Sequence, residues 1–162
     1  KPPDMLQEFH ARFYANRAHL AQTNEECWRG LFGSYPTFIE LLRRRATETE
    51  LAIATAKDRD SVMILLAHYG IDDLFPVDRV LDKNTGVTKV AHLEHIHGYL
   101  DIPYPEITFI DDKVNHLDSV AGLGVQCALA AWGYNGPREH RLAEDNGYLV
   151  CSLENAEAQL FQ

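Results

Sequence analysis

The chain has few cysteines, little positive charge and no long apolar run, and each of these shortages excludes a class of protein or binding site. Its 3 cysteines lie far apart and form no C-x-x-C pair, so the sequence indicates neither a disulfide framework nor a cysteine zinc site. Its 24 acidic residues outnumber the 15 basic ones, and the resulting net charge of -9 repels nucleic acid phosphates. We therefore expect a cytoplasmic protein that binds no nucleic acid.

Membrane segments and several common catalytic fingerprints are also missing. The longest apolar stretch, residues 120–132, is broken by Gly122, Gly124 and Gln126 and is too short to span a bilayer. No signal-like segment is found at the start of the sequence. The chain contains no P-loop, no G-x-G-x-x-G motif and no G-x-S-x-G elbow. We expect no membrane partner, and the commonest nucleotide-binding and serine hydrolase sites are excluded.

The sequence does contain an alternation of strands and helices. Apolar runs such as LAIATA and VQCALA lack polar alternation, which is typical of strands buried on both faces of a parallel sheet. The pattern predicts an α/β fold with a Rossmann-like, doubly wound parallel sheet. The predicted strands lie at residues 50–55, 77–80, 107–110, 125–130 and 148–150. The predicted helices lie at residues 3–21, 24–31, 37–45, 60–69, 88–100, 115–123 and 137–145, with a final helix after them.

Ligands of doubly wound sheets bind at the carboxyl ends of the strands, so the residues there are the functional candidates. Thr55 ends the strand at 50–55, and its hydroxyl, with nearby backbone donors such as that of Ala56, could hold a phosphate oxygen. The alternative is that Thr55 is an ordinary β-branched strand residue. Asp111 and Asp112 end the strand at 107–110 and could supply oxygen ligands to Mg²⁺, or could only cap the helix that follows.

A lysine and three histidines are further candidates for binding phosphate or metal. Lys89 begins a predicted helix, where it is either a solvated lysine or a point charge that neutralises a phosphate. His92, His95 and His97 lie in the segment HLEHIHG, but no H-E-x-x-H arrangement is present. We interpret these histidines as helix surface and not as a zinc site.

These signals occur in the order Thr55, Lys89, then Asp111 and Asp112, and the ordered set resembles the haloacid dehalogenase-like hydrolase superfamily. LAIATAKDRD looks like its second motif, GVTKVAHLEHI its third, and ITFIDDKVNHLDSVAGLGV its fourth. The segment that follows, which includes WGY, is similar to the phosphoglycolate phosphatase-like branch. The resemblance begins near Tyr35. It implies an α/β core at residues 35–162 and a short helical cap segment at residues 1–34.

The resemblance implies a Mg²⁺-dependent phosphohydrolase that hydrolyses the phosphate monoester of a small metabolite through an aspartyl-phosphate intermediate. In that reaction Thr55, Ala56 and Lys89 bind the phosphate, and Lys89 is also catalytic. The acids of the fourth motif bind Mg²⁺, with Asp112 preferred to Asp111.

One position departs from the fourth motif of the family. The family usually carries an acid or an asparagine four residues after the last aspartate, and this chain carries His116 there. His116 and Asn115 are therefore further candidate metal ligands, and Asp118 is an alternative to them.

The family's first motif, D-x-D-x-T, which carries the nucleophile, does not occur in the sequence. In the family's sheet its strand lies between the strand of Thr55 and the strand of Asp111, so a sheet without it would have two open edges at its centre. We expect the natural protein to carry this strand and motif immediately before Lys1. The alternatives are a catalytically inactive binding or scaffold module with the same fold, and a receiver-like phosphoacceptor domain.

Overall fold

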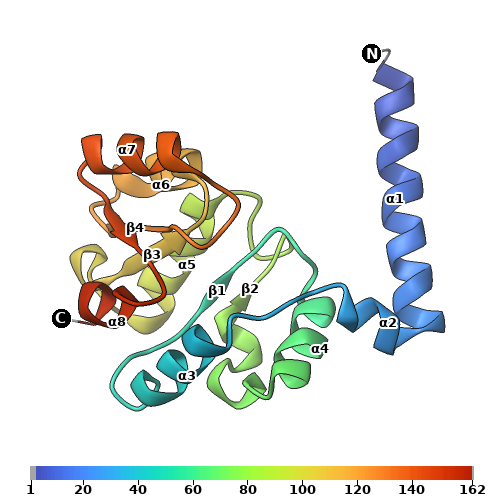
Figure 1. Ribbon diagram of the computed structural model, residues 1–162, viewed down its shortest axis with the longest axis horizontal. Helices are drawn as coiled ribbons and strands as arrows, with labels where there is room; N and C mark the ends of the chain where they lie inside the picture. The colour runs from blue at the N-terminus through green and yellow to red at the C-terminus, as the bar shows by residue number, and fades with distance from the viewer. Residues whose placement is uncertain (1–2, 162) are drawn as a thin grey trace. The chain divides into compact units, whose positions relative to one another are not determined.

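The computed structural model describes residues 3–161 and divides the chain into two compact units, one ending at Tyr35 and the other beginning at Pro36. The first unit consists of helices α1 (Pro3–Thr23) and α2 (Glu25–Gly30), as predicted (Figure 1). Asn24 separates them because its side chain accepts the Cys27 N–H at 3.0 Å and caps α2. From residue 3 to residue 161, no helix combines the length and the apolarity needed to cross a bilayer.

The second unit alternates helices with parallel strands, which confirms the predicted α/β class. Its strands are β1 (Ile53–Ala54), β2 (Val80–Leu81), β3 (Thr108–Asp111), β4 (Gln126–Ala130) and β5 (Leu149–Cys151). Its α-helices are α3 (Pro36–Arg45), α4 (Arg59–Tyr69), α5 (Lys89–Leu100), α6 (Val114–Ala121), α7 (Pro137–Asp145) and α8 (Ala156–Leu160). Three short 3₁₀ turns lie at Asp72–Leu74, Val77–Arg79 and Tyr104–Glu106.

The parallel strands form two separate sheets instead of one. β1 pairs with β2, and β3, β4 and β5 form a three-stranded sheet in that order. Among the described residues no strand pairs with the second edge of β1 or of β3. The predicted continuous sheet is therefore interrupted between β1 and β3, where the sequence analysis expects the strand of the first motif.

Two hydrophobic cores correspond to the two sheets. One packs α4 against β2 and includes Val62, Leu66 and Val80. The other packs α5, α6 and α7 against β3 and β4, and includes buried Leu117 and Leu129. Helix α5 also contacts β1, so the carboxyl ends of β1 and β3 are positioned with no described strand between them.

The strands of the smaller sheet are shorter than predicted. The strand predicted at residues 50–55 is reduced to two residues, and most of the one predicted at residues 77–80 is a 3₁₀ turn. β1 is hydrogen-bonded on one side only, and a strand extends no further than its partner allows. The prediction used local composition, whereas strand length depends on pairing.

A buried carboxylate anchors the segment between β2 and α5. Asp82 is 2% exposed and accepts the N–H groups of Asn84 at 2.9 Å and of Arg59 and Thr85 at 3.3 Å. Burial raises the pKa of Asp82, but these backbone donors outweigh it and hold the pKa below its usual value. The Asp82 carbonyl is 3.0 Å from the Nε2 atom of His92, which is also 2% exposed. The interpretation of His92 as helix surface is therefore wrong.

The lowered pKa of Asp82 predicts a pH-dependent stability. A carboxylate whose pKa falls on folding stabilises the protein above the pKa of the unfolded chain, and this contribution is lost as the pH falls through the folded pKa. Wild-type protein should therefore have a larger free energy of unfolding than Asp82→Asn at pH 7, and the difference should shrink below about pH 4. Urea unfolding at a series of pH values measures it. The exposed Asp72→Asn should show little difference at any pH, and a pH-independent gap for Asp82→Asn would contradict the prediction.

Candidate functional site

Lys89 contacts both sheets. Thr88 caps α5 by accepting the Ala91 N–H at 3.1 Å, which places Lys89 in the first turn of the helix. The Lys89 Nζ donates to the Ala54 carbonyl in β1 at 2.6 Å and lies 3.5 Å from Asp111 Oδ2 in β3. The Lys89 and Asp111 side chains are 19% and 11% exposed. A single half-buried ammonium group therefore joins the ends of β1 and β3.

The carbonyl that Lys89 binds faces the open edge of β1. Backbone groups of successive strand residues point to opposite sides, and the Thr55 N–H donates to Leu81 O in β2 at 2.9 Å. The N–H and C=O of Ala54 therefore point away from β2. The hydroxyl oxygen of Thr55 accepts the Lys57 N–H at 3.1 Å, which forms a polar turn after the strand. Thr55 thus lies next to the residue that Lys89 binds, as the predicted site requires.

Both oxygens of Asp111 have partners. Oδ2 faces the Lys89 ammonium, and Oδ1 accepts the Lys113 N–H at 3.0 Å and lies 2.9 Å from His116 Nδ1. His116 lies in the first turn of α6, so the helix brings its ring back over the end of β3. Asp111 is the centre of a hydrogen-bonded cluster with Lys89 and His116.

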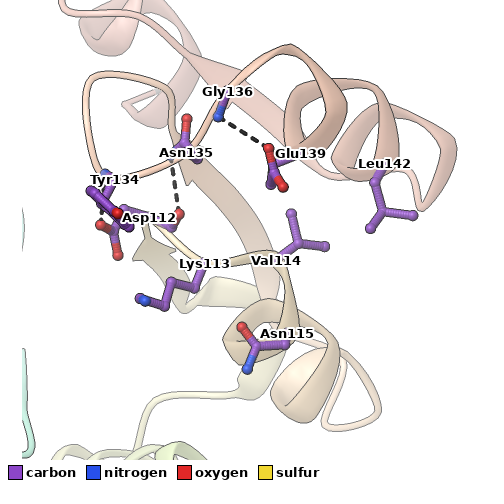
Figure 2. Close-up of a pocket in the computed structure, with 9 residues that line it drawn as sticks. All are labelled: Asp112, Lys113, Val114, Asn115, Tyr134, Asn135, Gly136, Glu139 and Leu142. Carbon is purple, nitrogen blue, oxygen red and sulfur yellow. Dashed lines mark hydrogen bonds between the residues drawn. The ribbon is translucent and has the colours of Figure 1, made fainter.

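Asp112 has a different environment from its neighbour. Its Oδ2 accepts the N–H of Tyr134 at 2.8 Å, and its carbonyl accepts the side-chain amide of Asn135 at 3.0 Å (Figure 2). Within residues 3–161 its second carboxylate oxygen, Oδ1, makes no hydrogen bond or ion pair. Asp112 therefore offers one oxygen to a ligand, whereas the oxygens of Asp111 are already engaged.

Asp112 also borders a cavity of about 620 Å³ between the first turns of α6 and α7 (Figure 2). The cavity is lined by Asp112, Lys113, Val114, Asn115, Tyr134, Asn135, Gly136, Glu139 and Leu142. Thr55 and Lys89 do not line it. The predicted site residues thus fall into two adjacent groups, one around Lys89 and Asp111 and one around Asp112 and Asn115.

Comparisons with known proteins agree with the predicted resemblance. A solved structure of a haloacid dehalogenase-like family hydrolase from Streptococcus pneumoniae superimposes with a TM-score of 0.66 at 19% identity, over 79% of this chain and 60% of that one. This chain has the haloacid dehalogenase-like fold. The resemblance is thereby confirmed at the level of the fold, and no protein-family model matches the sequence.

Curated sequences match a shorter stretch of this chain. The tyrosine-protein kinases PtkA of Mycobacterium bovis and Mycobacterium tuberculosis are each 31% identical to it over 93 residues. The match covers 56% of this chain and 31% of each relative. The chain therefore spans about a third of the length of the curated relatives it matches.

The residues at the ends of the strands fit a magnesium ion in part. The described part of the chain contains no group of three or more His, Cys, Asp or Glu side chains arranged to hold a metal. Mg²⁺ in phosphate-processing sites, however, usually takes one or two carboxylates and completes its shell with water and substrate oxygens. The free Oδ1 of Asp112 suits such a site, and Asn115 lines the same cavity.

Asp118 does not belong to this site. It accepts hydrogen bonds from Asn146 Nδ2 at 2.9 Å and from the Tyr148 hydroxyl at 2.8 Å, so it faces the segment leading into β5. Burial, together with the bond to Asp118, raises the pKa of Tyr148 to about 12. Asp118 thus ties α6 to the segment that precedes β5 and does not line the cavity beside Asp112.

The pairing of Lys89 with Asp111 predicts a measurable coupling. Residues in one hydrogen-bonded ion-pair network couple by about 0.5 to 3 kcal/mol in double-mutant cycles. A cycle of Lys89→Met and Asp111→Asn, followed by urea unfolding, should give a coupling near 1 kcal/mol. The exposed pair Arg43 and Asp73, 3.3 Å apart, is the control and should give less than about 0.5 kcal/mol. Equal couplings in the two cycles would mean that Lys89 is an ordinary surface lysine.

Proposed function

We propose that this chain belongs to a Mg²⁺-dependent phosphohydrolase that hydrolyses the phosphate monoester of a small metabolite through an aspartyl-phosphate intermediate. The observation that carries the proposal is the Lys89 ammonium, which lies between the Ala54 carbonyl, next to Thr55, and the Asp111 carboxylate. A cation held at the ends of two neighbouring strands can neutralise both a phosphoryl group and the carboxylate that attacks it.

The nucleophilic aspartate is proposed to lie on a strand inserted between β1 and β3. Two observations support this position. Among the described residues β1 and β3 each pair with one strand only, and the Ala54 carbonyl on the open edge of β1 accepts a hydrogen bond from a lysine instead of from a strand. A parallel strand inserted here would end beside Lys89 and Asp111, so a carboxylate following it would meet the ammonium group. We propose that a strand in this position carries the D-x-D-x-T motif.

The roles of the other residues follow from their positions. The Thr55 hydroxyl and the Ala56 N–H are proposed to bind a phosphate oxygen, because they lie in the turn before α4, where N–H groups point outward. Asp112 is proposed to bind Mg²⁺ through Oδ1. Asp111, His116 and Asn115 are proposed as further candidate ligands, ranked after Asp112. When bound, Mg²⁺ supplies positive charge to the phosphoryl oxygens. Residues 1–34 are proposed to be a short helical cap segment.

A second candidate function comes from the curated relatives. PtkA is named a tyrosine-protein kinase, and 31% identity over 93 residues favours phosphoryl transfer involving a protein tyrosine as the alternative reaction. An inactive scaffold with the same fold is the third candidate. The three candidates differ in the acceptor of the phosphoryl group: water for the phosphohydrolase, a protein tyrosine for the kinase, and no acceptor for the scaffold.

The test is an assay of the complete natural protein with p-nitrophenyl phosphate and a panel of phosphorylated metabolites, with and without Mg²⁺. Hydrolysis should require Mg²⁺, and Lys89→Ala and Asp112→Asn should each lower kcat by roughly a hundredfold or more, because each removes charge beside the phosphoryl group. Lys83→Ala, at a nearby lysine outside the described contacts of Lys89, is the control and should leave kcat unchanged. Unaltered turnover in both site variants would refute the assignment, and phosphate transfer from ATP to a tyrosine peptide would favour the kinase reading.

A further inference from the structure

The loop between β4 and α7, residues 131–136, holds Asp112 at two points. Its Tyr134 N–H donates to the Asp112 carboxylate, and its Asn135 side chain donates to the Asp112 carbonyl (Figure 2). The same Asn135 amide donates to Ala130 O at 2.9 Å, at the end of β4. One amide group therefore ties the end of β3 to the end of β4.

The Asn135 side chain is itself fixed. Its Oδ1 lies 2.7 Å from Nε2 of His140, which belongs to the first part of α7. Its amide and its carbonyl oxygen therefore both have partners, on three different elements. An asparagine held at both ends has lost its rotational freedom, so it can act as a rigid support for the backbone of Asp112.

Gly133 completes the contact with Asp112. A Cβ atom at residue 133 would lie 2.2 Å from the Asp112 Cβ and 3.1 Å from its Oδ2, which is closer than real atoms approach. Gly133 is not among the described glycines with a positive φ, so it is required for space and not for backbone conformation. The loop lies against the side chain of Asp112, and any larger residue at 133 would displace that carboxylate.

We propose that the β4–α7 loop is the positioning device for the cation ligand Asp112, with Gly133 and Asn135 as its positioning residues. The loop fixes Oδ2 through the Tyr134 N–H and leaves Oδ1 as the oxygen that binds a divalent cation. Mg²⁺ demands near-ideal octahedral geometry, so a carboxylate held in one orientation binds it better than a free one. The proposal rests on the phosphohydrolase function proposed above.

The experiment compares Gly133→Ala with Gly122→Ala in the complete protein. Gly122 ends α6 in a right-handed helical conformation, and an added Cβ there meets nothing within 4 Å, so it is a matched control. The readout is the Mg²⁺ dissociation constant, measured by calorimetry without substrate. Loss of a group that supports a metal ligand typically weakens binding by 10- to 100-fold. Gly133→Ala should show a loss of this size, and Gly122→Ala none.

A second readout separates positioning from a general loss of structure. The Tyr134 amide should exchange slowly with solvent in wild-type protein and in Gly122→Ala, and faster in Gly133→Ala, because its acceptor has moved. Asn135→Ala is the second variant, should Gly133→Ala fold poorly, and should weaken Mg²⁺ binding in the same direction.

The outcomes distinguish this inference from the proposed function. Normal Mg²⁺ binding by both Gly133→Ala and Asn135→Ala would overturn the positioning role, whether or not the protein hydrolyses phosphate. Weakened Mg²⁺ binding in these variants, in a protein that hydrolyses no phosphate ester, would support the positioning role and count against the phosphohydrolase. A wild-type protein that does not bind Mg²⁺ would overturn the inference as well.

Discussion

The bond from the Lys89 ammonium to the Ala54 carbonyl is the interaction on which the rest of the site depends. A buried carbonyl without a partner costs free energy comparable to a lost hydrogen bond, and the open edge of β1 presents such a carbonyl. A hydrogen bond from a charged donor contributes about 1.5 to 3 kcal/mol, compared with roughly 0.5 to 1.5 kcal/mol for a neutral one. The same ammonium faces Asp111, so the end of β1 and the end of β3 are held around a common positive charge.

The adjacent carboxylates of Asp111 and Asp112 have different partners because their side chains point in different directions. Successive side chains along an extended segment point to opposite sides, so Asp111 and Asp112 cannot both face Lys89. Asp111 joins Lys89 and His116, whereas Asp112 turns toward the β4–α7 loop and the cavity. One carboxylate balances the lysine charge inside the protein, and the other keeps an oxygen for a ligand. Two neighbouring residues of the same type thus acquire different chemistry from the directions of their side chains and from the β4–α7 loop that binds Asp112.

Helices could be predicted from the sequence better than strands, and the reason is physical. The helix at residues 137–145 has its predicted bounds because its signals are local: Pro137 at its first position and Gly147, with a positive φ, just beyond its end. The two-residue β1 could not be predicted, because its length depends on a partner far along the chain. Buried Asp82 was missed for the same reason. The segment LDKNTG has the composition of an exposed loop, and it is the Arg59 backbone, distant in sequence, that helps to bury the carboxylate.

The candidate site was predictable as a set of strand-end residues, but not in its arrangement. The order of Thr55, Lys89 and the two aspartates indicated the fold, since each follows or precedes a predicted strand. The role of Gly133 left no sequence signal, because a glycine needed for space looks like a glycine needed for a turn. The structure distinguishes the two, because a Cβ atom added at Gly133 would collide with Asp112. Gly133, 21 residues after Asp112 in the sequence, thus leaves room for the candidate metal ligand because it has no side chain.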